Sequence, residues 1–234
     1  MLLLAVETST PTSSVALLDR DGAVATASLG LPRRHGEFLA PAVVFCLQQA
    51  GRTVEDLTGV AVGTGPGLYT GLRVGMAFAQ ALAQARRLPV VGLPGLDVMG
   101  FSARHTAPTV HAAIDARRGQ VFWATYQRVP GGVQRDGDLQ VGSVDDLVAE
   151  IAAGDRPALI QSGLEGDGAL DQVAVHLAAR VDRPPLAVDL GLLAMPRFVR
   201  EETVRPGELD AIYLRRADAK IGWQSRGRLQ GGTS

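Results

Sequence analysis

Two acidic residues stand in equivalent positions in two similar stretches of this 234-residue chain. Glu7 follows the apolar run at residues 2–6, and Asp115 follows the apolar run at residues 110–114. The segments AVETSTPTSSVALL and AIDARRGQVFWATY align with the two acids in the same place. Carboxylates can hold a magnesium ion together with the phosphates of a nucleotide. The pair therefore raises the hypothesis of a magnesium–nucleotide site.

A glycine-rich segment, GTGPGLYTGLRVG at residues 63–75, joins an apolar strand to a helix. A turn of this kind can direct free backbone N–H groups at an anion, and the helix dipole adds to the attraction. The segment lacks the lysine and the spacing of a Walker P-loop, and it is not a dinucleotide fingerprint. Together with the two acids it gives one set of candidate anion-binding residues: Glu7, Thr8, Gly65, Gly67, Arg73, Asp115 and Arg117.

Most of these residues also have a structural interpretation. Gly65 and Gly67 permit a positive φ in a tight turn, and Asp115 can pair with Arg117. On the helix that follows, small residues recur every four positions, at Gly71, Gly75, Ala79 and Ala83. Interior glycines cost about 1 kcal/mol each relative to alanine, and close approach of another helix is the simplest compensation. We favour packing over phosphate binding for this segment.

The elements that must position these residues follow from hydrophobic periodicity. The first half predicts strands at residues 2–6, 14–18, 23–29, 59–62 and 89–91, and helices at 35–50, 70–87 and 96–104. The second half repeats the order, with strands at 110–114, 121–126, 133–141, 158–160 and 186–188. Its helices are expected after the N-cap Ser143, at 169–180 and at 190–201.

A three-strand meander followed by helix-separated strands gives a mixed sheet covered on both faces. We therefore expect an α/β protein of two lobes, each with a mixed five-stranded sheet flanked by helices. This layout resembles the duplicated ribonuclease-H-like fold of sugar kinases, actin and heat-shock chaperones. The expected lobes are residues 1–104 and 106–234, with a tail from about residue 208 packing back on the first lobe.

Composition excludes several classes of protein. The chain has 23 basic and 24 acidic residues, so it has no overall field to attract nucleic acid or an anionic membrane. Its single cysteine, Cys46, excludes an internal disulfide framework and fits a reducing compartment. The apolar start ends at Glu7 without a basic leader, and no apolar stretch is long enough for a membrane span. A cytoplasmic protein is expected.

Five segments, in order along the chain, resemble the bacterial TsaB family: LLAVETST, LPRRHGEFLAP, GTGPGLYTGLRVG, AIDARRGQVFWATYQR and DAIYLRRADAKIGW. The resemblance spans Leu2 to about Trp223. It implies a non-catalytic accessory subunit for threonylcarbamoyladenosine formation in tRNA. The implied partners are the transferase TsaD, the ATPase TsaE and a second copy of the chain, with tRNA engaged through the complex.

The resemblance also implies a pairing surface on the helices at residues 35–50 and 70–87. The residues expected at this interface are His35, Phe38, Leu39, Ala42, Phe45, Tyr69, Gly71, Leu72, Gly75, Met76, Ala79 and Ala83. The chain departs from the family at Leu68 and Tyr69, where Ser and Phe are usual. The change at residue 68 removes a hydroxyl from the glycine-rich loop, and Tyr69 keeps the aromatic ring.

Chemistry by this chain alone is not expected. TsaD carries a His-x-x-x-His metal pair, and the matching positions here are Gly95 and Met99, neither of which replaces an imidazole. The four histidines offer no pair at three- or four-residue spacing: His35, His105, His111 and His176. Kinase-type relatives of the fold place a glycine where this chain has Ser9. We expect no catalytic residue, no metal and no cofactor, and leave open ATP or ADP with magnesium at the partner interface.

Two alternatives remain from the sequence. The first is an autonomous sugar-kinase-like ATPase that uses Glu7, Asp115 and the loop at residues 63–67. The second is a peptidase, a label attached to relatives in this superfamily, but no Ser/His/Asp order supports it and Cys46 lies within a helix. A C-terminal basic cluster around Trp223 offers contact with RNA phosphates, although chain ends are usually solvated. Docking of residues 213–215 on the body is favoured there.

Overall fold

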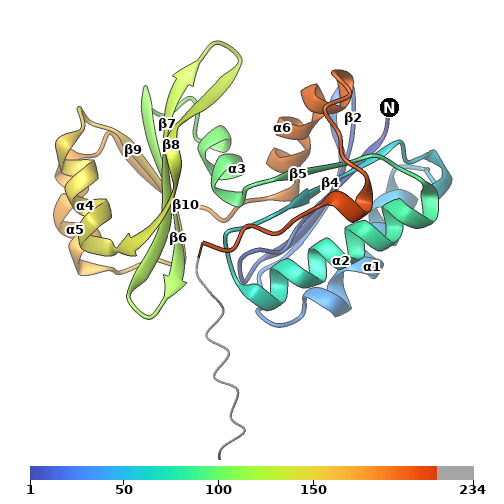
Figure 1. The fold of residues 1–234 in the computed structure, drawn as a ribbon, viewed down its shortest axis with the longest axis horizontal. Coiled ribbons are helices and arrows are strands. Elements are labelled where there is room, and N and C mark those ends of the chain that lie inside the picture. The colour runs from blue at the N-terminus through green and yellow to red at the C-terminus, as the bar shows by residue number, and fades with distance from the viewer. Residues whose placement is uncertain (215–234) are drawn as a thin grey trace, which may run out of the picture.

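The computed structural model describes residues 1–214 of the chain. Two five-stranded mixed sheets stand side by side, each flanked by helices (Figure 1). The α/β class with two mixed five-stranded sheets, expected from periodicity, is confirmed. The expectations placed on Arg215 and on the basic cluster around Trp223 lie outside the described residues.

The first sheet has the strand order β3-β2-β1-β4-β5. Its strands are β1 (Leu3–Glu7), β2 (Ser13–Asp19), β3 (Gly22–Leu29), β4 (Gly59–Gly63) and β5 (Val90–Leu93). The first three form an antiparallel meander, and β4 and β5 continue the sheet in parallel with β1. β1 is buried along its whole length, as its apolar sequence predicts for a strand covered on both faces.

Three helices cover this sheet: α1 (His35–Gln49), α2 (Tyr69–Arg86) and α6 (Ala187–Val199). Successive side chains of a strand point to opposite faces. Leu4 and Val6 therefore join the core beneath α1 and α2, whereas Leu3 and Ala5 join the core beneath α6.

The second sheet has the strand order β10-β9-β6-β7-β8. Its strands are β6 (Thr109–Arg117), β7 (Gln120–Val129), β8 (Gly132–Ser143), β9 (Ala158–Ser162) and β10 (Ala179–Asp182). Its helices are α3 (Gly95–Ser102), α4 (Val144–Ala153) and α5 (Gly168–Val173). Ser143 caps α4, because its hydroxyl accepts a hydrogen bond from the Asp146 backbone N–H at 3.2 Å. Short 3₁₀ helices lie between these elements at Val54–Asp56, Ala174–His176 and Pro206–Glu208.

Each lobe receives one helix from the other half of the sequence. α3 belongs to the first half, yet Leu96 and Met99 are buried in the core of the second sheet. α6 belongs to the second half, yet Leu190 and Ala194 are buried against the first sheet. The two helices also contact each other (Figure 1). The core around α3 and the core around α6 therefore each draw on both halves of the sequence.

Two elements differ from the sequence prediction. The strand expected at residues 186–188 is wrong, because the fifth strand of the second sheet is β10 and residue 187 begins α6. The helix expected at 169–180 ends as α5 at Val173. β10 is a short edge strand whose residues are only partly buried, so it lacks the apolar run that marks an interior strand.

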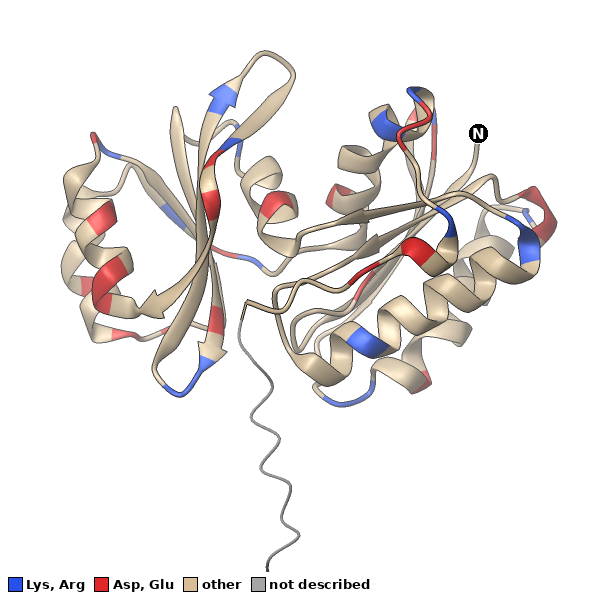
Figure 2. Cartoon of the chain, in the orientation of Figure 1, with Lys and Arg blue, Asp and Glu red and all other residues tan. Residues whose placement is uncertain are grey.

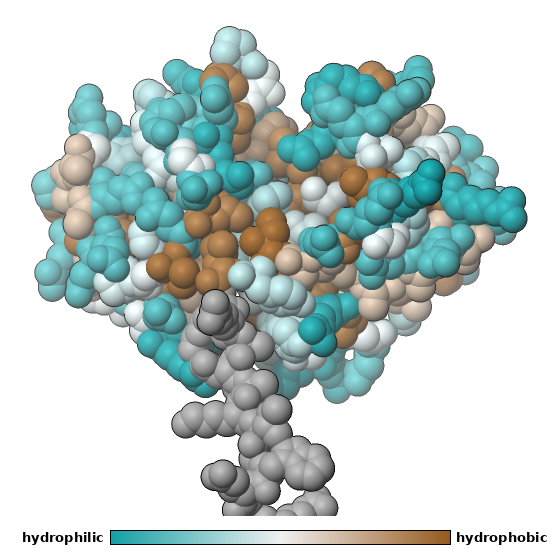
Figure 3. Space-filling view, viewed as in Figure 1, coloured by the Kyte–Doolittle hydropathy of each residue, from teal (hydrophilic) through white to brown (hydrophobic). Residues whose placement is uncertain are grey.

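The chain returns to the first lobe through residues 203–214, which we call the C-terminal strap (Figure 1). Val204 and Val90 exchange two backbone hydrogen bonds, at 3.0 and 2.9 Å. The Gln80 side chain on α2 donates to the carbonyls of Pro206 and Leu209 at 3.0 and 3.3 Å. Near the end of the strap, Leu214 packs on the second core, where apolar side chains gather between the lobes (Figure 3). No helix among residues 1–214 is long and apolar enough to cross a membrane.

Candidate functional site

The glycine-rich loop after β4 is filled by the turn between β1 and β2. The Leu68 backbone N–H donates to the Ser9 carbonyl at 2.7 Å. A Cβ on Gly67 would overlap the same carbonyl, so only glycine admits this approach. Gly65 has a positive φ of 92° and its carbonyl accepts from the Gly95 backbone N–H at 2.9 Å. The loop thus contacts its own chain, and the packing interpretation accounts for its glycines at 65 and 67.

The small-residue stripe on α2 also packs inside the chain. A Cβ on Gly71 would overlap the Thr8 carbonyl, and a Cβ on Gly75 would overlap the Thr8 hydroxyl. That hydroxyl donates to the Gly71 carbonyl at 2.8 Å. Ala79 and Ala83 have no exposed surface. The expectation that this stripe admits a partner's helix is therefore corrected: it admits the β1–β2 turn of the same chain.

Glu7 is fully buried behind this turn. Its Oε1 accepts the Ser9 backbone N–H at 2.6 Å, and a Cβ on Gly63 would overlap its carboxylate. No hydrogen-bond donor reaches Oε2 from the described residues. Burial raises the pKa of Glu7 above its ordinary value, and the hydrogen bond from the Ser9 backbone N–H opposes part of the rise. Glu7 accordingly presents no accessible charged carboxylate to a metal ion.

Asp115, the second strand-end acid, is occupied by its own neighbour. The Arg117 guanidinium lies 3.0 Å from Oδ2, and the Arg117 backbone N–H donates to Oδ1 at 2.7 Å. The structural alternative for this pair is thus observed. Asp115 lines a hollow of about 300 Å³ with Glu165 and Asp167, but Asp167 caps α5. No group of three or more ligating side chains that could hold a metal ion occurs in the described part of the chain.

The structure contains a Ser–His pair that the sequence analysis missed. Ser13 Oγ lies 2.6 Å from His35 Nδ1, but Ser13 has no exposed surface and His35 is 4% exposed. Burial lowers the pKa of His35 and raises that of Cys46, which is also inaccessible. Ser13 and His35 are 22 positions apart in the sequence, so no local motif marks the pair. The geometry gives no exposed nucleophile at this pair.

The positions matched to the metal-binding histidines of TsaD are inaccessible as well. Met99 is fully buried in the second core. Gly95 is buried, and a Cβ there would lie 3.2 Å from Ser9 Oγ and 3.5 Å from Pro185 Cγ. Both positions serve the packing between α3 and its neighbours.

Nine of the twelve residues expected at the partner interface are buried within the chain: His35, Leu39, Ala42, Gly71, Leu72, Gly75, Met76, Ala79 and Ala83. Their side chains or Cα atoms pack α1 and α2 onto β1, onto β2 and onto each other, so within the chain they serve its own core. Phe38 is partly buried, whereas Phe45 and Tyr69 are 50% and 45% exposed.

The outward sides of α1 and α2 nonetheless form an apolar surface. Val44 is 52% exposed beside Phe45, and Val74 and Phe78 of α2 are partly exposed. Few charged residues interrupt the two helices (Figure 2). We call this surface the α1–α2 face and define it by Phe38, Val44, Phe45, Tyr69, Val74 and Phe78. The sequence analysis missed Val44, Val74 and Phe78, although the four-residue spacing of Val74 and Phe78 places them on one side of α2.

Arg73, a candidate anion-binding residue, is held at the N-terminal end of α2 by two tyrosines. Its guanidinium carbon lies 4.1 Å from the centre of the Tyr69 ring, and Nε donates to the Tyr213 hydroxyl at 3.3 Å. The two rings are 5.6 Å apart. This exposed cluster ties the C-terminal strap to α2.

The two sheets and their helices define the fold class of the actin-like ATPases. A solved structure described as the activator of the 2-hydroxyisocaproyl-CoA dehydratase from Clostridium difficile, with bound ADPNP, superposes with a TM-score of 0.53. It is 9% identical and covers 91% of this chain and 100% of that chain. A likeness at this identity shows the fold alone.

More similar sequences identify the family. A family model described as TsaD, tRNA N6-adenosine threonylcarbamoyltransferase, matches residues 30–166. TsaB of Escherichia coli strain K12 is 33% identical over 227 residues, covering 92% of this chain and 95% of its own. YeaZ from Pseudomonas aeruginosa superposes with a TM-score of 0.79 at 31% identity, covering 91% of this chain and 99% of that chain. The chain belongs to the TsaB family.

Proposed function

We propose that this chain is an accessory subunit in the formation of threonylcarbamoyladenosine in tRNA. It binds and activates a TsaD-like transferase, acts together with a TsaE-like ATPase, and touches tRNA through that complex. The observation that carries the proposal is the match over 92% of the chain to a protein named tRNA threonylcarbamoyladenosine biosynthesis protein TsaB. The site geometry supports a non-catalytic role, because Glu7 is buried and the glycine loop is filled. A cytoplasmic location accords with this role.

The α1–α2 face is the proposed contact with the transferase. Aromatic and aliphatic side chains at the centre of a surface dominate binding energy when a partner removes them from water. The face offers four aromatic rings and two valines on two rigid helices. In the absence of a transferase the same surface pairs with a second copy of the chain, so the two assemblies compete. A nucleotide at this contact is not required by any group described above.

Reconstitution of the modification on a tRNA transcript tests the proposal. We expect product with the transferase, the ATPase and this chain, and a large loss when this chain is omitted. Unchanged product without the chain would refute the accessory role. The alternative hypothesis of an autonomous ATPase predicts instead that the chain hydrolyses ATP without any partner.

A charged substitution on the α1–α2 face can test its role in binding without disturbing the core of the chain. Phe45→Glu should weaken binding to the transferase by about tenfold or more, because an anchor is replaced by a charge that cannot be desolvated. The matched control is Val175→Glu, since Val175 is 82% exposed on the second lobe. Equal binding by the two variants in calorimetry would remove the α1–α2 face from the proposal without touching the family assignment.

A further inference from the structure

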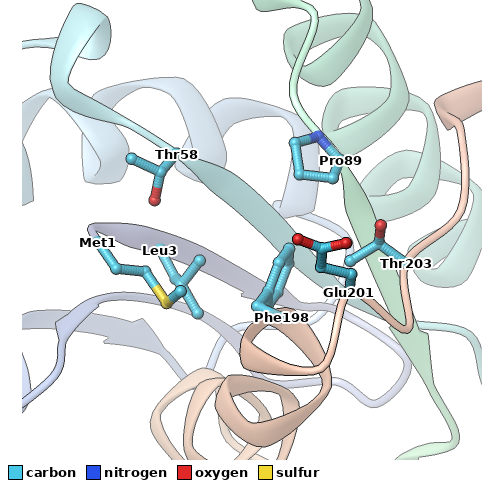
Figure 4. A pocket seen from close by; sticks show the side chains of 7 residues that line it. All are labelled: Met1, Leu3, Thr58, Pro89, Phe198, Glu201 and Thr203. Atoms are coloured by element: carbon cyan, nitrogen blue, oxygen red, sulfur yellow. The ribbon is translucent and has the colours of Figure 1, made fainter.

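A hollow of about 510 Å³ opens at the amino ends of β1, β4 and β5, at the opposite end of β1 from Glu7. Leu3 and Pro89 form two of its walls, and the Phe198 ring at the end of α6 lies between them (Figure 4). Met1 closes one side (Figure 4). The volume falls within the range of sites for small organic ligands. This hollow is separate from the α1–α2 face.

The aromatic wall of the hollow is fixed by β4. A Cβ on Gly59 would lie 2.5 Å from Phe198 Cε1 and 3.0 Å from Leu3 Cδ2, so the ring rests directly on the backbone at Gly59. Phe198 is 8% exposed and belongs to the core beneath α6. The wall is therefore formed before any ligand arrives, which reduces the entropy lost on binding.

The charged group of the hollow is Glu201. This residue follows the C-cap of α6 with a φ of 58°, and its backbone N–H donates to the Phe198 carbonyl at 3.2 Å. The left-handed position is one that usually holds glycine, and here it directs a carboxylate over the hollow beside Thr203 (Figure 4). The next acid, Glu202, is paired with Arg200 at 2.6 Å. Within residues 1–214, by contrast, no hydrogen bond or ion pair engages the Glu201 carboxylate.

We propose that this hollow binds a small organic ammonium ion. The ammonium group pairs with the Glu201 carboxylate, and an aromatic or aliphatic body lies on Phe198, Pro89 and the Met1 side chain. Glu201 is the one charged side chain among the lining residues, so it is the side chain that can pair with a cation. A cation near an aromatic ring gains further attraction from the ring quadrupole, and the Met1 thioether suits contact with an aromatic body.

Phenethylammonium is the probe that fits these requirements, and 2-phenylethanol is its neutral counterpart. The full chain is labelled with ¹³C-methyl methionine and carries any tag at the C-terminus, because Met1 lines the hollow. Titration with phenethylammonium should shift the Met1 methyl signal to saturation. The Met99 methyl, fully buried in the other lobe, should remain in place. 2-Phenylethanol should bind about tenfold less tightly, as expected for loss of one charge-assisted hydrogen bond.

Three variants locate the interaction. Glu201→Gln should weaken phenethylammonium by about tenfold and abolish its preference over 2-phenylethanol. Glu202→Gln, the matched control, should bind as the parent does. Glu201→Gly keeps the left-handed turn and should lose the ammonium preference while its stability stays equal or rises. An unmoved Met1 signal, equal binding of the alcohol, or an equal loss in Glu202→Gln would each overturn the proposal.

Discussion

Replacing Gly75 with alanine should destabilise the chain only while Thr8 keeps its hydroxyl. The new Cβ would overlap Thr8 Oγ1 but would lie 3.4 Å from Thr8 Cβ and 3.6 Å from Thr8 Cγ2. The overlap is therefore with one atom. Overpacking in a core costs about 1–3 kcal/mol, and alanine in a helix gains about 1 kcal/mol over glycine, so the net loss should be about 0–2 kcal/mol.

The same change in a Thr8→Ala background should have the opposite sign. Thr8→Ala alone removes the hydrogen bond to the Gly71 carbonyl and should cost about 1 kcal/mol. With the hydroxyl gone, Gly75→Ala should be neutral or stabilise by up to about 1 kcal/mol. The double-mutant cycle should thus give a coupling energy of about 2 kcal/mol.

Urea unfolding followed by circular dichroism measures all four proteins. Gly36→Ala is the matched control, because Gly36 also lies in a helix but nothing approaches its Cβ within 4 Å. That variant should gain stability in either background. An equal effect of Gly75→Ala with and without the Thr8 hydroxyl would refute the packing argument. So would a variant that keeps its stability but loses self-association, since this is what a partner-facing stripe requires.

Two further predictions follow from buried groups. Burial raises the pKa of Glu7 in the folded state, so protonated Glu7 contributes stability below the ordinary pKa of 4.5, and this contribution is lost as the pH rises through the folded-state pKa. Glu7→Gln should therefore show a flatter dependence of stability on pH and should be more stable than the parent at neutral pH. Calorimetric Tm values across the pH range measure this, and identical pH profiles for the two proteins would contradict it. Leu190→Ala on α6 should lower the free energy of unfolding by about 2–5 kcal/mol, because the Leu190 side chain is fully buried against the first sheet. Leu192 lies on the same helix but is 37% exposed, so Leu192→Ala should change the free energy of unfolding by no more than about 1 kcal/mol, as measured by denaturant unfolding.

The strands of the first lobe were predictable because their apolar runs are bounded by turn residues. The position of α6 was not predictable in the same way. Periodicity shows that a helix buries one side, as Leu190 and Ala194 do, but it does not show which sheet receives that side. β10 escaped prediction because an edge strand with three partly buried residues and one exposed residue carries no apolar run.

The candidate site shows a similar division. The glycines at 67, 71 and 75 correctly indicate that something comes very close to the backbone. Glycine spacing gives no information on the occupant, which proves to be the turn around Thr8 and Ser9. The polar sequence of that turn resembles an exposed loop. Its burial depends on hydrogen bonds to residues about 60 positions away, such as the one from Thr8 to Gly71.

The exchange of α3 and α6 has a consequence for biosynthesis. While the ribosome is still adding residues before position 187, the Leu3 and Ala5 side of the first sheet lacks α6, the helix that packs on β1 and β2. An apolar sheet surface left open in this way is a site for aggregation or chaperone binding. We therefore expect the nascent chain to need protection until α6 has emerged, and neither half should be stable when it is expressed alone.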